Sequence, residues 1–300
     1  MTYRTPLRYP GGKARLSGYI KNIIKLNKLT GKNYIEPFAG GAGVALELLF
    51  SNVVDKIYLN DINIAVYSFW RSVLEKNDLF CEMINDTPIN IEEWEKQQEI
   101  QKKDNKKDYL KLGFSTFFLN RTNRSGIIKA GVIGGKSQSG IWKLDARFNK
   151  VDLIKRIKNI GQLSSKINLN RQDAGEFINS LSKNIRQESL LYLDPPYYVK
   201  GKGLYEHHFQ DEDHIELYKK LLNAEYPYWL VSYDSADFII RLYKEYRSIL
   251  YNLNYSAQNR TIGKEVMFFS NSVIIPNFTM NKSIKKHRLP NDGIFQAKVA

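Results

Sequence analysis

The amino-acid sequence predicts an α/β fold in which a mostly parallel sheet ends in an antiparallel hairpin and is interrupted by a helical insert. Seven short runs are rich in apolar, β-branched and aromatic residues, and helix-like segments separate most of them. Only a polar loop separates the last two runs, which indicates a hairpin. Between residues 64 and 158 this alternation stops and helical patterns follow one another.

Each expected element follows from its local pattern. The strands are apolar runs bounded by polar or turn-forming residues, at 33–36, 56–60, 166–169, 190–193, 228–232, 248–251 and 266–269. The helices repeat apolar residues at helical spacing, at 43–50, 175–181, 211–222 and 235–243, and within the insert at 67–74, 91–101 and 109–119. Glycines and cations crowd residues 121–143, which predicts a loop or hairpin at the tip of the insert.

These elements predict a discontinuous sheet domain at residues 1–63 and 159–280, an inserted domain at 64–158 and a loosely ordered basic tail at 281–300. The chain has 300 residues, which is enough for this organisation. Its single cysteine, Cys81, excludes an intramolecular disulfide and a cysteine-rich zinc site. No run approaches the roughly 18 apolar residues of a membrane span, and the N-terminus lacks a signal-peptide core, so we expect a cytoplasmic protein.

The charge balance indicates a polyanionic partner. A formal net charge of +14 favours association with phosphates, because each neutralised phosphate releases condensed counterions. The 19 tyrosines and 15 phenylalanines include candidates for stacking on exposed bases. A generally basic proteome and an aromatic core would give the same composition, so charge alone does not decide the partner.

A glycine-rich turn follows the first expected strand. Residues 36–43 read Glu-Pro-Phe-Ala-Gly-Gly-Ala-Gly and lead into a helix, while Asp61 follows the second strand. Glycines at such a turn let the backbone approach a ligand closely, and a carboxylate on the next strand can accept hydrogen bonds from ribose hydroxyls. This arrangement predicts a nucleoside cofactor. The residues leave two candidates open, NAD and S-adenosylmethionine.

The tetrapeptide Asp194-Pro195-Pro196-Tyr197 ends an apolar strand, at the edge of the sheet where α/β sites form. A carboxylate and a rigidly presented backbone carbonyl, here of Asp194 and Pro195, can hold the two protons of an exocyclic amine and aim its lone pair. Tyr197 can stack on a base that has been rotated out of a duplex. The pattern therefore predicts methyl transfer to an amine of a nucleobase, with no covalent intermediate.

Taken together, these motifs resemble the Dam-type DNA adenine methylases, the alpha-class N6-adenine DNA methyltransferases. The resemblance spans about residues 5–275 and rests on segments 6–13, 36–43, 59–63, 118–121 and 194–197, which occur in the family's order. It implies a Rossmann-like, mostly parallel seven-stranded sheet with a terminal hairpin. It also implies that the mainly helical insert is a target recognition domain, and that S-adenosyl-L-methionine is the methyl donor.

The resemblance carries roles onto the matching positions. Asp194, Pro195 and Tyr197 are the expected catalytic residues, and no metal is expected. The cofactor is expected to contact Glu36 and Asp194 and a further set of residues, namely Tyr9, Lys13, Phe38, Gly40, Asp61 and Asp173. Tyr9 replaces a tryptophan found in some members but keeps an aromatic face. For Asp173, a helix cap is the alternative to a contact with the cofactor's adenine.

The expected nucleic-acid contacts lie in two basic segments. Those in the insert are Arg121, Asn123, Arg124 and Lys136, and those before the last strand are Asn259 and Arg260. Arginine and asparagine can read base edges or contact phosphates, and each of these residues can instead have a structural role. Adjacent His207 and His208 lack the acidic partners of a metal site.

The expected function is site-specific N6-adenine methylation of double-stranded DNA by a monomer. Other classes stay open: an N4-cytosine or RNA N6-adenine methyltransferase, and a non-catalytic DNA-binding relative. An NAD oxidoreductase would leave the tetrapeptide at 194–197 unexplained. The sequence does not show the DNA target, or whether a cognate restriction endonuclease is a partner in a restriction-modification system.

Overall fold

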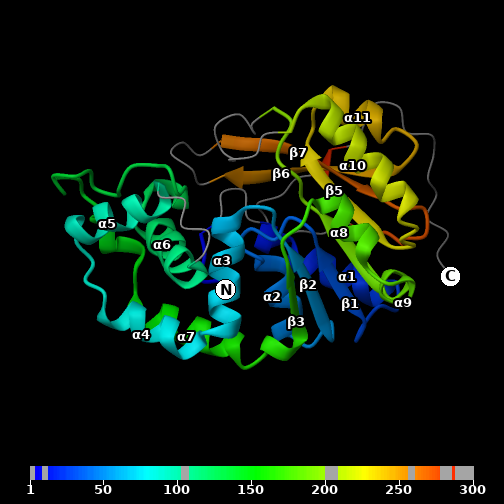
Figure 1. Cartoon of the computed structure of the whole chain (residues 1–300). Helices are drawn as coiled ribbons and strands as arrows, with labels where there is room; N and C mark the ends of the chain where they lie inside the picture. The colour runs from blue at the N-terminus through cyan, green and yellow to red at the C-terminus, as the bar shows by residue number, and fades with distance from the viewer. Residues whose placement is uncertain are drawn as a thin grey trace.

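One mixed sheet forms the centre of the molecule (Figure 1). A computed structural model describes residues 4–8, 13–102, 108–199, 209–255, 261–277 and 286–287. In the described chain the strand order is β3-β2-β1-β4-β5-β7-β6-β8. The strands β1 to β5 pair in parallel, whereas β7 runs antiparallel to both β5 and β6. The expected parallel sheet with a terminal antiparallel hairpin is therefore confirmed.

The strands agree with the expected runs but differ in length. They are β1 (Asn33–Glu36), β2 (Lys56–Asn60), β3 (Ile167–Asn170), β4 (Ser189–Leu193), β5 (Trp229–Asp234), β6 (Arg247–Tyr255), β7 (Thr261–Phe269) and β8 (Lys286–His287). The hairpin strands β6 and β7 extend well beyond their apolar runs, because backbone pairing continues through their polar ends. The short β8 adds an eighth strand from the expected tail and pairs with Leu250 and Tyr251 of β6.

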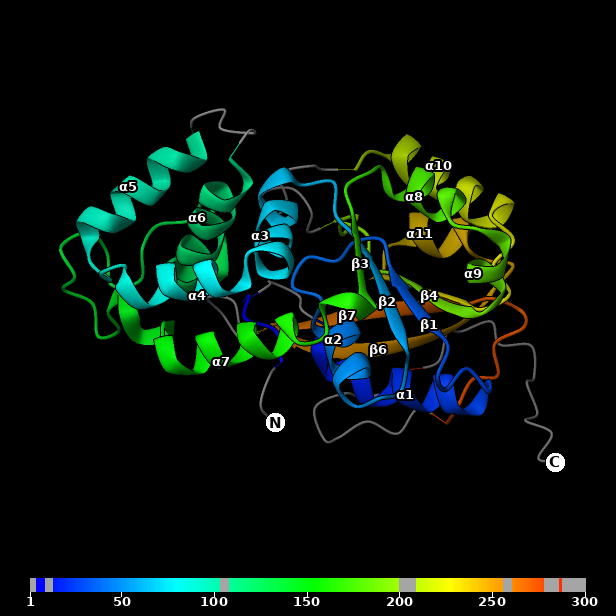
Figure 2. The ribbon, with the colours of Figure 1, turned by 60° about the horizontal axis from the view of Figure 1, so that its bottom comes forward.

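Helices cover both faces of the sheet (Figure 2). On one face lie α1 (Ser17–Leu26) and α2 (Gly43–Phe50), and on the other lie α8 (Ala174–Ser180), α10 (Asp211–Asn223) and α11 (Asp237–Leu242), while the short α9 (Lys183–Gln187) leads into β4. Residues of β4 alternate between two cores: Leu190 and Tyr192 face the first, Leu191 and Leu193 the second. Burial on both faces explains why this strand is a continuous apolar run.

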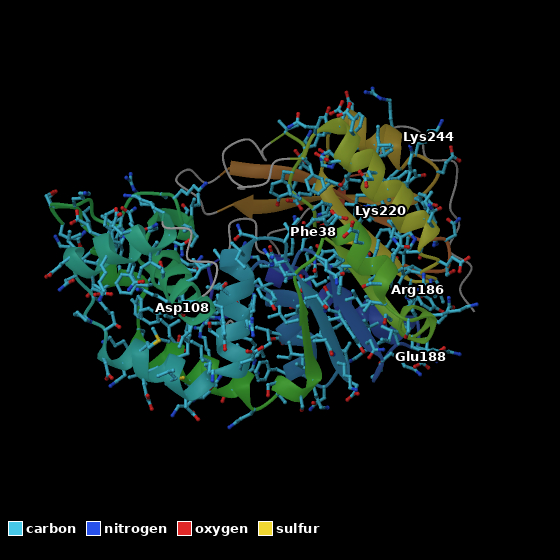
Figure 3. The ribbon with its side chains drawn as sticks, in the orientation of Figure 1. Phe38, Asp108, Arg186, Glu188, Lys220 and Lys244 are labelled. Carbon is cyan, nitrogen blue, oxygen red and sulfur yellow. The ribbon has the colours of Figure 1, made fainter. Side chains whose placement is uncertain are left out.

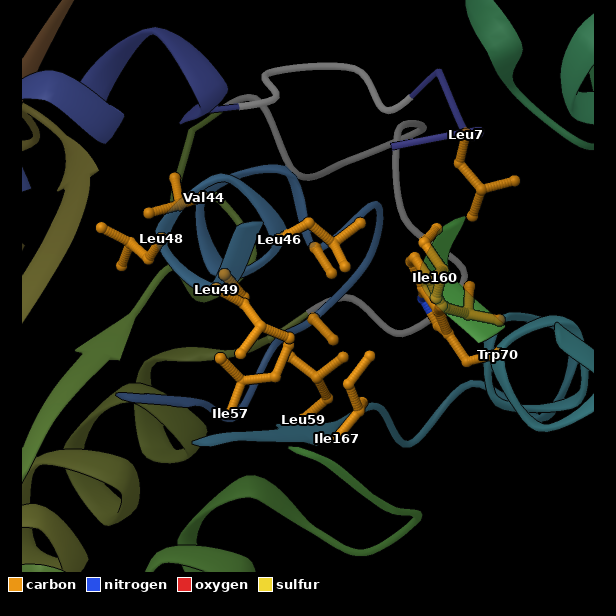
Figure 4. Packing of buried hydrophobic residues seen from close by; sticks show 14 of the residues in the cluster. Leu7, Val44, Leu46, Leu48, Leu49, Ile57, Leu59, Trp70, Ile160 and Ile167 are labelled. Atoms are coloured by element: carbon orange, nitrogen blue, oxygen red, sulfur yellow. The ribbon is translucent and has the colours of Figure 1, made fainter. Parts of the chain in front are cut away.

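The first core fixes α2 against the sheet. Figure 4 shows Leu46 and Leu49 of α2 beside Ile57 and Leu59 of β2, and all four are buried. Burying one such side chain contributes about 1.5–3 kcal/mol. Trp70 of the insert belongs to the same core, which therefore continues from the sheet into the helical insert. This packing holds the turn between β1 and α2 in place.

The insert is a group of α-helices beside the sheet (Figure 1). Its described helices are α3 (Ile64–Glu75), α4 (Asn77–Asp86), α5 (Ile91–Lys102), α6 (Tyr109–Thr122) and α7 (Lys150–Gly161), with the short 3₁₀ turns η2 (Arg124–Gly126) and η3 (Leu144–Arg147). Two further 3₁₀ turns lie in the sheet domain, η1 (Lys13–Leu16) and η4 (Ser164–Lys166). Helices α3 and α6 cross closely at Gly113, where a Cβ would lie 2.5 Å from the Ser68 carbonyl oxygen. The expected boundary at residue 158 falls within α7.

None of the described helices is long and apolar enough to cross a membrane.

Candidate active site

Acidic residues meet at one edge of the sheet. Glu36 ends β1, Asp61 follows β2, Asp194 follows β4 and Asp234 ends β5. Because β1 pairs in parallel with both β2 and β4, and β4 with β5, the carboxyl ends of these strands are neighbours. Sites of α/β proteins form at this edge. The structure thus brings the predicted carboxylates of three strands together.

The glycine turn after β1 is fixed from two sides. Asp61 Oδ2 accepts a hydrogen bond from Gly40 N at 2.9 Å, and Trp70 Nε1 of α3 donates to Gly40 O at 2.8 Å. Gly40 and Ala42 both have a φ of 46°, in the left-handed region that glycine adopts without strain. Contacts from the sheet and from the insert therefore set the shape of this turn.

Asn60 joins the turns that follow β1 and β3. Its Nδ2 donates to Pro37 O and Gln172 O, each at 3.0 Å, and its Oδ1 accepts from Gln172 N at 2.9 Å. The side chain is 1% exposed. This amide keeps two loops of the sheet edge in register, a role that the sequence did not indicate.

Glu36 is a buried carboxyl beside the glycine turn. It is 5% exposed, and its Oε2 has no hydrogen-bond partner in the described chain. Burial raises the pKa of this carboxyl well above its usual value, and the negative Asp194 adds to the effect, while the Ala45 N–H opposes it. The orphaned oxygen can accept a hydrogen bond from a ligand in the site.

The other predicted cofactor residues have varied surroundings. Phe38 packs edge-to-face on Phe209, with ring centroids 6.0 Å apart, and Figure 3 shows it near the middle of the molecule. Asp173 is the N-cap of α8: its Oδ1 accepts from Glu176 N at 3.1 Å and pairs with Lys220 Nζ at 3.1 Å. The helix-cap alternative for Asp173 thus fits its contacts. Tyr9 lies outside the described residues.

The Asp194 carboxylate is asymmetric. Ser232 Oγ of β5 donates to Oδ1 at 3.0 Å, and Lys13 Nζ lies 3.4 Å from the same oxygen. Within the described chain no hydrogen bond reaches Oδ2, and the side chain is 25% exposed. Burial raises the pKa of Asp194 to about 6; Lys13 opposes this increase and Glu265 reinforces it. One oxygen is thus occupied and the other is available.

A buried ionic network lies behind Asp194. Lys13 Nζ donates to Glu265 Oε2 at 2.5 Å and to Tyr197 OH at 2.9 Å. Tyr197 OH donates to Glu265 Oε1 at 2.8 Å, and Tyr251 OH donates to Oε2 at 2.9 Å. Burial would lower the pKa of Lys13, but Asp194 and Glu265 outweigh it and hold that pKa well above its usual value. Lys13 is therefore an ammonium in this network.

The tetrapeptide is anchored at both ends. Tyr197 is 3% exposed, and the Lys13 ammonium lies 4.8 Å from its ring centroid, so the ring is covered here and its stacking on a base stays a prediction. Beyond it, Asp234 Oδ1 and Oδ2 accept from Tyr198 N at 2.9 Å and Val199 N at 2.8 Å. These bonds fix the path of the chain that leaves the tetrapeptide.

Asn123 is a structural residue in its described contacts. It is fully buried; its Oδ1 accepts from Trp94 Nε1 at 2.6 Å, and its Nδ2 donates to the carbonyl oxygens of Ile127 and Ile128. All of these bonds are internal to the insert, so its amide is not presented to a base in this structure. The side chain shapes the turn at the tip, and the expected DNA contact at Asn123 stays a prediction.

The other expected DNA residues differ in exposure. Arg121 is 9% exposed, and burial lowers its pKa to about 9, with added repulsion from Arg156 and Arg8. Arg124 is exposed, and Lys136 is exposed and pairs with Glu95 at 2.8 Å. Asn259 and Arg260, like His207 and His208, lie outside the described residues.

Sequence reasoning missed several residues that complete the site: Ser232, Tyr251, Glu265, Trp70 and Asn60. For Glu265 a signal was present, because it is a charged residue beside the apolar run 266–269 of β7. A buried charge at such a position requires a partner. The residues Trp70 and Asn60 carry no comparable signal, because both occur in ordinary apolar or strand-end contexts.

The chain is similar to known methyltransferases. It is 26% identical over 259 residues to the Type II methyltransferase M.MjaIII of Methanocaldococcus jannaschii, with 79% of this chain and 87% of the relative covered. Among solved structures, it is similar to a putative RNA methyltransferase from Pyrococcus horikoshii, with a TM-score of 0.41, 12% identity and coverage of 88% and 85% of the two chains. It is also similar to TrmN from Thermus thermophilus, with a TM-score of 0.38, 11% identity and coverage of 83% and 47%.

Neither structural likeness is close enough to support an assignment. The model of the family described as D12 class N6 adenine-specific DNA methyltransferase matches residues 9–262 of this chain. These residues include the glycine turn, the insert and the tetrapeptide. The carboxylates, the anchored tetrapeptide and the glycine turn occupy one edge of the sheet, where sites of α/β proteins form. The chain belongs to the D12 class N6 adenine-specific DNA methyltransferase family.

Proposed function

We propose that the protein transfers a methyl group from S-adenosyl-L-methionine to N6 of an adenine at a specific site in double-stranded DNA. Family membership supports the reaction. The observation that carries the site assignment is the asymmetry of Asp194, whose Oδ1 is occupied by Ser232 and Lys13 while Oδ2 is available at the edge of the sheet.

The residues at this edge fit the methyl donor. S-adenosylmethionine carries a sulfonium and an ammonium group, and the site offers the carboxyls of Glu36, Asp61 and Asp194. The unpartnered Oε2 of Glu36 suits the ammonium or a hydroxyl of such a ligand. Asp61 already accepts from Gly40 and Asn63, and each carboxylate oxygen has a second lone pair for a ribose hydroxyl. When bound, the donor supplies an electrophilic methyl group.

Asp194 and Pro195 would hold the target amine. Asp194 Oδ2 accepts a hydrogen bond from one N6–H and the Pro195 carbonyl accepts a hydrogen bond from the other, so the nitrogen lone pair points away from the ring plane. The N–C bond forms as the C–S bond breaks, and the sulfur keeps the electron pair. The proton that N6 then loses passes to Asp194 and on to water. The adenine must leave the base stack to reach this edge, which costs a few kcal/mol.

We also propose that helices α3 to α7 and the segment 121–143 form the target recognition domain. Arg121, Arg124 and Lys136 would contact DNA, while Asn123 shapes the segment that carries them. Tyr9 remains proposed for the cofactor, and Asn259 and Arg260 for DNA. A cognate restriction endonuclease would be a partner of the same system, not a component of this site.

The test is methyl transfer itself. The protein is incubated with radiolabelled S-adenosylmethionine and unmethylated genomic DNA, and the DNA is digested to nucleosides. Label in N6-methyladenine is expected from the wild type, and Asp194→Ala is expected to lose at least about 10²-fold in rate, as when a charge-stabilising group is removed. Asp55→Asn, which removes an exposed carboxylate paired with Lys166, is the matched control and should keep the wild-type rate.

Label in another nucleoside, or none, would refute the proposed reaction. Transfer by Asp194→Ala at near the wild-type rate would refute the catalytic assignment. Circular dichroism of each variant verifies that the fold is retained.

A further inference from the structure

Glu265 is a fully buried carboxylate in β7, at the antiparallel end of the sheet. Figure 1 shows β7 beside β5, the strand that supplies Ser232. A buried charge is costly unless it is paired and hydrogen-bonded, and removing one partner leaves the other uncompensated. Glu265 accepts from Lys13, Tyr197 and Tyr251, so it joins three separate segments of the chain.

Lys13 is shared unequally between two carboxylates. Its ammonium nitrogen lies 2.5 Å from Glu265 Oε2 but 3.4 Å from Asp194 Oδ1. The shorter contact orients the ammonium toward Glu265, and the longer one leaves it on the Oδ1 side of Asp194. Since Ser232 also binds Oδ1, both described contacts reach the same oxygen. Glu265 therefore limits how far Lys13 can move toward Asp194.

Tyr197 is the second element that Glu265 holds. The phenol donates to Glu265 Oε1 at 2.8 Å and accepts from Lys13 at 2.9 Å. Tyr197 is three residues from Asp194, with two prolines between them that restrict the backbone. Fixing the phenol thus fixes the turn that presents the Pro195 carbonyl.

We propose that Glu265 is a positioning residue of the methyl-transfer site, which holds Lys13 and Tyr197 so that Oδ2 of Asp194 and the Pro195 carbonyl remain aimed at the target amine. This inference rests on the proposed function and adds a residue to it. Glu265 acts through Lys13 and Tyr197, and it does not touch the reacting atoms.

Replacing Glu265 has a defined electrostatic consequence. In Glu265→Gln, Lys13 loses its closest carboxylate, and Asp194 becomes its remaining acidic neighbour in the network. The ammonium then moves toward Asp194, which weakens that carboxylate as an acceptor. The groups that face Asp194 are, from the elements around it, Lys13 of η1, Tyr34 and Glu36 of β1, Tyr192 of β4, Tyr233 of β5, Tyr251 of β6 and Glu265 of β7.

The pH profile distinguishes positioning from general stability. The negative charge of Glu265 raises the pKa of Asp194, and Lys13 lowers it. Glu265→Gln removes the first effect and strengthens the second, so both changes move the acidic limb of kcat to lower pH. A purely structural defect would reduce the amount of active protein without moving this limb.

The experiment measures kcat and KM for DNA across pH, together with binding of S-adenosylmethionine. Glu265→Gln should lower the plateau kcat by about 10²-fold, leave KM for DNA within about twofold and shift the acidic limb to lower pH. Glu265→Asp keeps the charge but shortens the side chain, so it should lower kcat while the limb stays at the wild-type pH.

Each test variant has a matched control: Glu47→Gln is the control for Glu265→Gln, and Tyr243→Phe is the control for Tyr251→Phe. Glu47→Gln removes a carboxylate that pairs with Lys21 at 2.9 Å, away from the site, and should leave kcat and its pH profile unchanged. Tyr251→Phe removes one hydrogen bond to Glu265 and should lower kcat about fivefold. Tyr243→Phe removes a buried hydroxyl that has no hydrogen-bond partner in the described chain, and should not affect kcat.

The outcomes separate this inference from the reaction on which it rests. A wild type that forms no N6-methyladenine refutes the proposed function. An active wild type, with a Glu265→Gln variant whose kcat or acidic limb is unchanged, refutes the positioning role alone. If Glu265→Gln does not fold, the pair Tyr251→Phe and Tyr243→Phe decides: equal rates in the two variants would overturn the inference.

Discussion

At the scale of single residues, the site depends on how Asp194 is surrounded. Burial raises its pKa from 3.8 to about 6; the nearby Lys13 opposes this increase, and the negative charge of Glu265 reinforces it. A carboxylate with a raised pKa is a stronger base when ionised, which suits a group that must accept a proton from an amine.

This pKa gives a pH dependence with a definite sign. Asp194 is ionised above its pKa, and the proposed role requires the ionised form. The rate of methyl transfer should therefore be constant above about pH 7 and fall as pH decreases through about 6. The measurement is kcat from pH 4.5 to 8 at saturating substrates, with circular dichroism at each pH as a control for unfolding. An acidic limb near pH 4, the range of an ordinary aspartate, would contradict the raised pKa.

The sequence could predict the residues whose signal is local. The tetrapeptide, the glycine turn and Asp61 each lie at the end of a recognisable strand, and the structure brings them to one edge. The bond between Lys13 and Glu265 joins residues 252 positions apart, so no local pattern could pair them. Asn123 is the reverse case: its amide suits base recognition, but its surroundings, which only the fold reveals, use all of its described hydrogen bonds internally.

At the scale of secondary-structure elements, periodicity predicted the sheet better than the helices. The apolar runs predicted every strand of the parallel part of the sheet, because a strand that is buried on both faces is a continuous run of apolar residues. The helices α1, α7 and α9 were not predicted as elements. In α7, for example, only Leu153, Ile157 and Ile160 are buried, so charged residues dominate its sequence and the apolar stripe is narrow.

The end of α6 and the turn that follows form a unit that Asn123 holds together. Its three hydrogen bonds, to Trp94, Ile127 and Ile128, are in a fully buried position. Asn123→Ala should lower the free energy of unfolding by about 2–3 kcal/mol, because buried groups lose their partners. Urea denaturation measures this loss. Asn85→Ala, at an exposed position whose side chain donates to Asp86 Oδ1, should change stability by less than about 0.5 kcal/mol.

The same variant tests what the turn does. If Asn123 shapes a segment that contacts DNA, Asn123→Ala should raise KM for DNA at a temperature where the protein remains folded, while the affinity for S-adenosylmethionine stays within about twofold. A stability loss below about 0.5 kcal/mol would contradict the structural role, and a fall in affinity for the methyl donor alone would contradict the link to DNA.

At the scale of the whole molecule, the excess of positive charge includes a group of neighbouring arginines around Arg121. Arg121 is repelled by Arg156, Arg8 and Arg147, and Arg147 also repels Arg8; the Asp152 carboxylate opposes the repulsion on Arg121. The buried Nε atoms of Arg121 and Arg156 have no hydrogen-bond partner in the described chain. Such a group of guanidiniums is electrostatically strained by itself, and a phosphate would relieve it.

The net charge of +14 and this group of arginines predict a steep salt dependence of DNA binding. The logarithm of the affinity should fall linearly with the logarithm of salt concentration, since each phosphate contact releases counterions and contributes a slope of about 0.9. Arg147→Gln, an exposed member of the group, should reduce the slope by about that amount. Lys183→Gln, on the short α9 at the far side of the sheet from the insert, changes net charge equally and should leave the slope unchanged (Figure 1).

Fluorescence anisotropy with a labelled duplex measures the DNA affinity of the wild type and of the two variants. A flat salt dependence would contradict a phosphate-binding surface, and equal effects of the two variants would mean that net charge acts on DNA without a localised site.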